Sequence, residues 1–303
     1  MATKRKSKRR SGALSTLLVL LVALAALLYH QFFAPPPPHN DPVQPVEGQV
    51  LLHVIDVGQG DAILLTAPEG NVLIDAGDNV KRHEQALAAY LDEMGVTQLD
   101  YFVLTHVHAD HIGGADMILT NYKVKNVLMT DDVASSGVFN AMLDALEQSQ
   151  ATVIQATPGQ TFSLGDLHLN VLGPLDDYSN TNDNSIVLRA TYGSVAMMFT
   201  GDAEGNEEGE AERDLVARYS AAELQSDFYK AGHHGSDTSS SKAFLQAVSP
   251  SIVAISVGEG NSYGHPVPSV LNALEAMGAE VYRTDLDGTL VFVCDGETIE
   301  YRK

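Results

Sequence analysis

Four side chains of the kinds that bind metals lie within six residues, in the segment His106-Val107-His108-Ala109-Asp110-His111. On an extended chain, residues two apart point to the same side, so His106 and His108 can hold one ion together. A tight turn at the following glycine pair then brings Asp110 and His111 towards a second ion. Three imidazoles and a carboxylate suit zinc, manganese or iron. The segment therefore predicts a metal site rather than a solvated polar loop.

A second group of candidate ligands follows two other predicted strands. Asp202 ends the apolar strand 194–200, where a carboxylate can bridge two metal ions. The strand 226–230 runs into Lys230-Ala231-Gly232-His233-His234-Gly235-Ser236. Paired histidines between glycines at a strand end are typical of a ligand loop, the alternative being two exposed loop residues.

Two further residues are predicted to support such a site. Asp75 ends the strand 71–75 and is predicted to orient a ligand imidazole by a hydrogen bond. His265, in Tyr263-Gly264-His265-Pro266, is either a site residue or a structural loop residue. Because Cys294 is the only cysteine, an internal disulfide and a cysteine-rich zinc site are excluded. Histidines and carboxylates must therefore hold any metal.

Short strands and helices alternate from residue 49 to residue 303. The predicted strands are 49–57, 62–66, 71–75, 100–104, 124–129, 226–230, 251–257, 280–283 and 288–293, with a strand-rich stretch at 152–200. The predicted helices are 81–94, 113–121, 137–148, 207–218, 240–248 and 267–276. Interleaved strands and helices predict a layered α/β domain.

The first 48 residues have a different character. Residues 1–12 hold six bases and no acid, and the uncharged run 13–33 is long enough to span a bilayer as a helix. The basic side is expected in the cytoplasm, which places residues 49–303 outside the cytoplasmic membrane. The alternative is a cleavable signal peptide and a secreted domain. Residues 34–48 contain four consecutive prolines, at 35–38, and are predicted to be an extended linker.

The charge of the chain beyond the basic tail bears on the size and charge of the substrate. Only 12 of the 18 Lys and Arg residues remain there, against all 39 acids, a net charge of −27. An acidic surface repels polyanions at long range, so it favours a small or weakly charged substrate.

The motifs occur in a diagnostic order along the chain. They are residues 56–62 (DVGQGDA), 73–77 (LIDAG), 105–114 (THVHADHIGG), 182–188 (NDNSIVL), 200–202 (TGD), 230–236 (KAGHHGS) and 264–266 (GHP). This order resembles the metallo-β-lactamase fold and, within it, the hydrolase domain of ComEC, a family of bacterial DNA-uptake channels. The resemblance covers about residues 49–303. It implies an αββα sandwich of two mixed sheets with outer helices and a site at one edge.

The resemblance also implies one or two divalent ions, zinc or manganese. His106 and His108 would bind the first ion, Asp110 and His111 the second, and Asp202 would bridge them. Residues 182–185 depart from the pattern, because most hydrolases of this fold carry a further histidine for the first metal there.

The resemblance leaves one ligand open, and the mechanistic roles are predicted from the chemistry of the residues on this scaffold. Either His233 or His234 would complete the second metal site. Asp110 or Asp202 would orient a metal-activated water and accept its proton. His265 or His234 would contact the phosphate or protonate the leaving oxygen.

Lys230 and Ser236 would be additional phosphate contacts. The expected function is that of a membrane-anchored nuclease or phosphodiesterase outside the cytoplasmic membrane of a bacterium, with DNA as substrate. ComEC proteins contain a polytopic channel, whereas one candidate span predicts no channel here. The alternatives are a hydrolase of a small phosphoester, a lactone or a cell-envelope phosphodiester, and a non-catalytic binding domain.

Overall fold

A computed structural model describes residues 46–206 and 209–302. These all belong to one compact unit, Asp41–Lys303. The predicted basic tail, the predicted anchor at 13–33 and most of the predicted linker lie outside the described residues. Within the described residues, no helix has the length and apolar character needed to cross a bilayer. The anchor therefore stays a prediction.

Eight strands form the first sheet, in the order β15-β14-β1-β2-β3-β4-β5-β6. Their bounds are β1 Val50–Val54, β2 Ile63–Ala67, β3 Gly70–Ile74, β4 Gln98–Val103, β5 Lys123–Met129, β6 Thr152–Gln155, β14 Leu290–Cys294 and β15 Ile299–Arg302. The strands from β15 to β3 pair antiparallel, whereas β3, β4, β5 and β6 pair in parallel. The sheet is therefore mixed.

Seven strands form the second sheet, in the order β13-β12-β11-β10-β9-β8-β7. Their bounds are β7 Thr161–Leu164, β8 Leu167–Gly173, β9 Val187–Tyr192, β10 Val195–Phe199, β11 Phe228–Lys230, β12 Ile252–Ile255 and β13 Glu280–Arg283. Here β7 to β10 pair antiparallel, and β10 to β13 pair in parallel. Each sheet thus has one antiparallel half and one parallel half.

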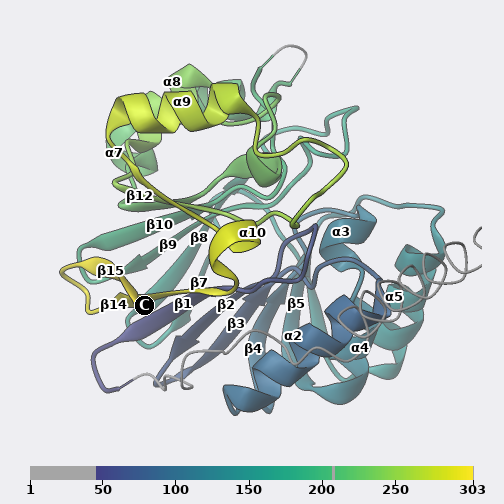
Figure 1. The fold of residues 1–303 in the computed structure, drawn as a ribbon. Coiled ribbons are helices and arrows are strands. Elements are labelled where there is room, and N and C mark those ends of the chain that lie inside the picture. The colour runs from purple at the N-terminus through teal and green to yellow at the C-terminus, as the bar shows by residue number, and fades with distance from the viewer. Residues whose placement is uncertain (1–45, 207–208, 303) are drawn as a thin grey trace, which may run out of the picture. The chain divides into compact units, whose positions relative to one another are not determined.

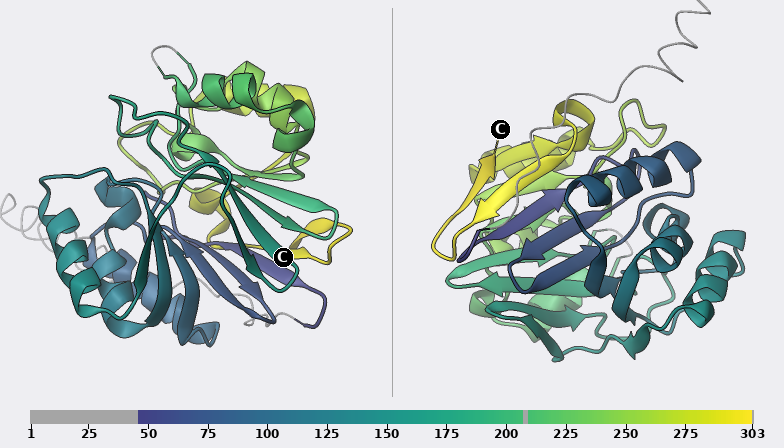
Figure 2. Two further views of the ribbon diagram at one scale, coloured as in Figure 1. Left: turned by 180° about the vertical axis from the view of Figure 1, so that it is seen from behind. Right: turned by 90° about the horizontal axis from the view of Figure 1, so that it is seen from below.

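Helices cover the outer faces of the two sheets (Figure 1, Figure 2). Those on the first sheet are α2 Lys81–Glu93, α3 Ala109–Ile112, α4 Ala115–Asn121 and α5 Gly137–Gln148. Those on the second sheet are α6 Ala211–Arg218, α7 Ala221–Leu224, α8 Lys242–Val248 and α9 Pro268–Met277. A 3-10 turn, η1 Gly232–Gly235, and a short helix, α10 Thr284–Asp287, lie in connections. The predicted αββα sandwich of two mixed sheets is confirmed.

Strand β1 shows how the sequence builds these layers. Alternate side chains point to opposite faces of a strand, and Val50, Leu52 and Val54 all lie in the core between the sheets. His53 points to the other face, where its Nδ1 lies 2.8 Å from the hydroxyl oxygen of Tyr90 in α2. Both faces of the strand are buried, so its sequence is nearly continuously apolar.

Several boundaries differ from the sequence prediction. The helix predicted at 113–121 corresponds to α4, which begins at Ala115, and the short helix α3 before it was not predicted. Gly113 and Gly114 separate the two helices. The helix predicted at 207–218 begins later, as α6 at Ala211, and residues 207–208 lie outside the described residues. Helices α7 and α10 and strand β15 were not predicted, since four-residue elements are too short to show a periodicity.

A buried carboxylate under the second sheet's helices makes stability depend on pH. Glu212 on α6 is 0% exposed and accepts hydrogen bonds from the backbone N–H groups of Ser240 and Ser241, at 2.7 and 2.8 Å. Burial raises the pKa of Glu212 from 4.5 to about 7, against the lowering effect of the Ser241 and Ser240 hydrogen bonds. The folded state therefore holds a proton that the unfolded chain releases above its ordinary pKa.

The sign of this effect follows from linkage. Because the folded pKa is the higher one, the contribution is present below pH 4.5 and is lost as pH rises towards 7. The loss is on the order of 3 kcal/mol in the free energy of unfolding. Denaturant unfolding between pH 5 and 8 is expected to show this component in the wild type and not in Glu212→Gln. Parallel pH profiles for the two proteins would contradict it.

Candidate metal centre

The predicted site residues converge where strands of both sheets end. Asp75 follows β3, His106 follows β4, Asp202 follows β10 and His234 follows β11. The carboxyl ends of parallel strands lie at one edge of each sheet, and the two edges meet here. The parallel halves of both sheets therefore position this constellation.

The metal-motif segment changes from extended to helical backbone at one residue. His108 is extended, with φ −72° and ψ 149°, and precedes the first turn of α3, which carries Asp110 and His111. The expected tight turn is thus a helical one. Gly60 packs against this turn, and a Cβ at Gly60 would lie 2.2 Å from the carbonyl oxygen of Asp110. Only glycine fits this approach, which accounts for the Gly58-Gln59-Gly60-Asp61 turn.

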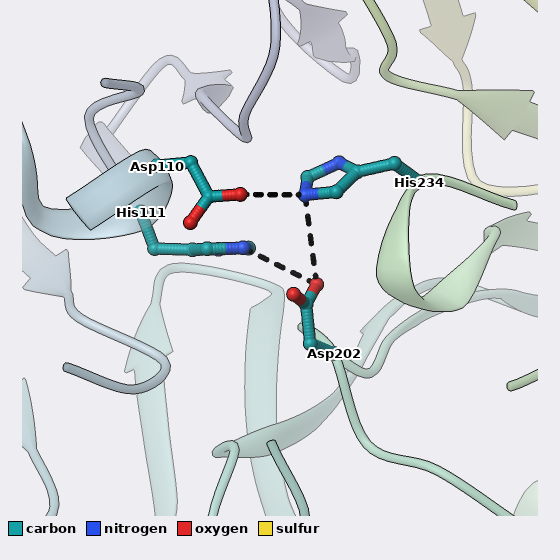
Figure 3. Close-up of side chains that lie close together, drawn as sticks. All are labelled: Asp110, His111, Asp202 and His234. Atoms are coloured by element: carbon teal, nitrogen blue, oxygen red, sulfur yellow. Dashed lines mark ion pairs between the residues drawn. The ribbon is translucent and has the colours of Figure 1, made fainter. Parts of the chain in front are cut away.

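One cluster joins Asp110, His111, Asp202 and His234, whose ligand atoms all lie within 4.8 Å of one another (Figure 3). Asp202 Oδ1 is 3.2 Å from His111 Nε2 and 3.8 Å from His234 Nε2. His234 Nε2 is also 3.3 Å from Asp110 Oδ2. We call these four residues the second cluster.

The second cluster fits a divalent cation. His111 Nε2, Asp202 Oδ1 and His234 Nε2 are buried and have no hydrogen-bond partner among the described residues. Buried polar atoms are rarely left unsatisfied in folded proteins. Two imidazole nitrogens and two carboxylates that face one another form a suitable donor set for zinc, manganese or iron.

A first cluster comprises His106, His108 and Asp202. His106 Nε2 lies 3.0 Å from His108 Nδ1 and 3.7 Å from Asp202 Oδ2. The two oxygens of Asp202 therefore face different clusters, which is the geometry that a bridging carboxylate requires. Within the described residues this cluster has three candidate ligands, consistent with the missing histidine at 182–185.

Hydrogen bonds fix the orientation of the ligand imidazoles. Asp75 Oδ2 accepts from His111 Nδ1 at 2.7 Å, and the same carboxylate accepts from the Thr105 N–H and hydroxyl at 2.8 and 2.7 Å. His106 Nδ1 lies 3.1 Å from Thr105 Oγ1 and 3.3 Å from Ser185 Oγ. These contacts place the Nε2 atoms towards Asp202, as expected for partners that orient metal ligands.

The geometry decides between His233 and His234, either of which could complete the second metal site on sequence grounds. His234 is buried, and its Nδ1 lies 3.0 Å from the carbonyl oxygen of Ser256 while its Nε2 faces the second cluster. His233 is half-buried, with its Nδ1 3.1 Å from Glu204 Oε1 and its Nε2 3.7 Å from Asp202 Oδ2. Both have left-handed φ values, 47° and 53°, a strained conformation that is concentrated at functional sites.

His234 is accordingly the histidine that completes the second cluster. We expect His234→Ala to weaken binding of a divalent metal by more than the roughly 10- to 100-fold that loss of an orienting partner costs. His233→Ala should retain metal, because its Nε2 lies outside both clusters. Isothermal titration of each variant with manganese checks this. Equal losses in the two variants would show that the geometry does not discriminate between them.

The charges of the second cluster are set by burial and by mutual attraction. Burial alone favours neutral side chains, but Asp202 and Asp75 outweigh it and raise the pKa of His111 well above its ordinary value. Asp202 and Asp61 likewise raise the pKa of His234 to about 9. The same pairing lowers the pKa values of Asp110 and Asp202. Protons therefore compete with a cation here, and metal binding should release them.

Two predicted phosphate contacts do not reach the site. Lys230 is 1% exposed, and its Nζ forms an ion pair with Asp61 Oδ2 at 2.7 Å and donates to the Ala231 carbonyl oxygen at 2.9 Å. Ser236 is also buried, and its hydroxyl lies 3.0 Å from Thr238 Oγ1. Direct phosphate binding by either residue does not fit this structure, because strand β11 points Lys230 into the interior.

A pocket of about 310 Å³ opens over both clusters. Its lining comprises Gln59, His108, Ala109, Asp110, Asn182, Asp202, His233, His234, Tyr263 and His265. His265 thus lies where the sequence placed it as a site residue. Burial, followed by the charges of His233 and His234, lowers its pKa, which favours a neutral ring near pH 7.

Sequence reasoning missed four residues of this site. Asp61 Oδ1 lies 3.3 Å from His234 Nδ1, and Glu204 accepts from Asn182 Nδ2 and Thr238 Oγ1 at 2.9 Å. Tyr263 stands at the pocket rim. The Gly-Asp turn at 60–61 was a usable signal. Asn182 begins the 182–188 motif, but its contact with Glu204 is a tertiary contact that the local sequence does not indicate.

The profile described as the metallo-beta-lactamase superfamily matches residues 55–259, more than half of the chain. This chain belongs to that superfamily. The activity that the metallo-β-lactamase fold and the two clusters support is that of a metal-dependent hydrolase using divalent ions.

Comparison with curated proteins narrows the group within the superfamily. "ComE operon protein 3" of Bacillus subtilis (strain 168) is 34% identical over 268 residues, which is 83% of this chain and 34% of that protein. "Competence protein ComA" of Neisseria gonorrhoeae is 31% identical over 246 residues, 81% of this chain and 32% of its own length. The resemblance to ComEC proteins is therefore confirmed, although the chain spans about a third of the length of these relatives.

A solved structure supports the fold independently. The metallo-β-lactamase fold protein YhfI of Bacillus subtilis matches with a TM-score of 0.54, covering 81% of this chain and 100% of that one. The sequences are 12% identical, so this match bears on the fold alone.

Proposed function

We propose that this superfamily member is a membrane-anchored phosphodiesterase that cuts DNA on the outer side of a bacterial cytoplasmic membrane. The observation that carries the proposal is the pair of clusters that share Asp202 at the floor of an open pocket. Two adjacent divalent ions stabilise both the attacking and the leaving oxygen of a phosphodiester. DNA is proposed as the substrate by analogy with the ComEC family of DNA-uptake proteins, which the motifs resemble and which the similarity to competence proteins supports.

When bound, the divalent ions would lower the pKa of water and neutralise charge on the phosphoryl oxygens. The side chains of the protein would orient the attacking water, accept its proton and contact the phosphate. Asp110 is one-third exposed and faces the pocket, with one oxygen towards His234, so it can orient the attacking water and accept its proton. Asp202 is buried and holds both clusters together, which makes Asp110 the better proton acceptor.

His265 and His233 are neighbours in the wall of the pocket. Their rings are 5.7 Å apart in an edge-to-face contact, and both line the pocket. We assign His265 to the phosphate oxygens or the leaving group. Glu204 holds His233 through Nδ1, which directs its Nε2 towards Asp202.

A second candidate is a small phosphodiester, such as a cell-envelope headgroup. No Lys or Arg lines the pocket among the described residues, and the acidic body disfavours a long polyanion. This candidate keeps the same metals and the same catalytic residues and changes only the substrate.

One assay separates the two. The full-length chain is tested with manganese and with zinc on single-stranded DNA, duplex DNA and a chromogenic phosphodiester, beside His108→Ala. Cleavage of DNA that is lost in His108→Ala supports the nuclease proposal. Turnover of the small diester alone would replace it with the second candidate, and failure on every substrate would reject both.

A further inference from the structure

We propose that Tyr263 is a stacking platform for a nucleobase of single-stranded nucleic acid next to the cleavage site. This inference rests on the proposed phosphodiesterase function and specifies how that site would hold its substrate. Tyr263 is 68% exposed at the rim of the pocket. It is the only aromatic side chain among the strongly exposed large apolar residues that the structure describes.

The ring is connected to the clusters through two other rings. Tyr263 stacks on His265, with centroids 5.8 Å apart and planes inclined by 26°. His265 in turn contacts the His233 ring, whose Nε2 is 3.7 Å from Asp202 Oδ2. One part of the tyrosine ring is thus backed by His265, and the exposed remainder is available beside the pocket.

The side chain of Asn261 braces the loop that carries Tyr263, in addition to backbone hydrogen bonds such as that from the Asn261 N–H to the Gly258 carbonyl oxygen. Asn261 Oδ1 accepts hydrogen bonds from the N–H groups of Tyr263 and His265, both at 3.1 Å. Its Nδ2 donates to the carbonyl oxygens of Gly258 and His265, at 3.1 and 2.7 Å. An exposed apolar ring on a loop fixed in this way is ready to bind, because little freedom remains to be lost.

Stacking also accounts for binding a nucleic acid without a basic surface. Phosphate contacts usually require Lys or Arg, and the described pocket lining contains neither. A base presents an uncharged face, and stacking on an aromatic ring tolerates any sequence. Bases in a duplex are already stacked on one another, so the platform selects single strands.

The first test uses the absence of tryptophan from the sequence. Tyr263→Trp creates a sole tryptophan whose fluorescence should be quenched by a short oligothymidylate. An abasic oligomer of equal length and charge should not quench it. The matched control is Val153→Trp, on edge strand β6, where an exposed side chain lies outside the pocket. Quenching by both oligomers, or by neither, overturns the platform.

The second test separates binding from chemistry. In the manganese-loaded full-length chain, Tyr263→Leu should raise KM for oligothymidylate by about 5- to 100-fold, with little change in kcat. Tyr263→Phe should keep the wild-type KM, and KM for the abasic oligomer should not change in either variant. Equal KM values for oligothymidylate in all three proteins would reject the stacking role of Tyr263 without contradicting the phosphodiesterase activity. If quenching occurs but neither oligomer is cut, the platform stands and the phosphodiesterase fails.

Discussion

Asp202→Asn is expected to lower kcat/KM for phosphodiester cleavage by roughly 10³-fold or more. Asp202 is the one residue common to both clusters, with Oδ1 facing His111 and Oδ2 facing His106. An asparagine has nearly the same shape but carries no charge and offers a single oxygen. Loss of metal-based charge stabilisation costs several kcal/mol in the transition state, and each 1.36 kcal/mol is tenfold in rate. Steady-state kinetics at saturating manganese measure the effect.

The control for this variant is another acid beside the site. Asp132 interacts electrostatically with His108 of the first cluster and accepts a hydrogen bond from Asn184, but it belongs to neither cluster. Asp132→Asn should keep most of the activity, and both variants should retain the wild-type circular dichroism spectrum. An Asp202→Asn enzyme with activity within about tenfold of wild type would mean that the two clusters do not act through this carboxylate.

Asp75→Asn is expected to weaken metal binding by about 10- to 100-fold. Asp75 Oδ2 accepts the hydrogen bond from His111 Nδ1 at 2.7 Å, and this bond fixes the imidazole with Nε2 towards the cluster. An asparagine can still accept from Thr105, but its amide group can turn an N–H towards His111 and oppose the required orientation. Competition titration against a metal-sensitive dye measures the dissociation constant.

A matched substitution distinguishes orientation from simple loss of a buried acid. Asp100 is also buried. It accepts a hydrogen bond from the Asn71 N–H at 3.0 Å and forms an ion pair with Lys125. These contacts lie near the starts of β3 and β4, whereas the metal site lies beyond the ends of the same strands. Asp100→Asn should lower stability without changing metal affinity. Comparable losses of metal in the two variants would indicate a general effect on the fold instead of a specific role for Asp75.

Much of this architecture could be predicted from sequence because the signals are local. The strand before His106 is apolar. The two-residue spacing of His106 and His108 predicts that both side chains point to the same side, and a tight turn after them brings His111 near. Asp75 and Asp202 each end an apolar strand, and strand ends of parallel sheets meet. Those positions follow from periodicity and strand polarity alone.

The remaining features depend on tertiary contacts that leave no local signal. The position of Lys230 beside two histidines predicted a phosphate contact. In the structure its side chain points into the interior and pairs with Asp61, which lies 169 positions earlier in the chain. The choice between His233 and His234 depends on left-handed backbone that the sequence GHHG permits but does not specify. Glu204 contacts His233 from 29 positions earlier in the chain, a pairing that neither local segment indicates.

The most direct test of the account is removal and return of metal on the full-length chain. The protein is stripped with a chelator, and bound manganese and cleavage of single-stranded DNA are measured together as the ion is added back. We predict that activity is absent without metal and returns in proportion to the metal that the two clusters bind. DNA cleavage that persists in the stripped protein, or full metal binding with no cleavage, would contradict a metal-dependent nuclease.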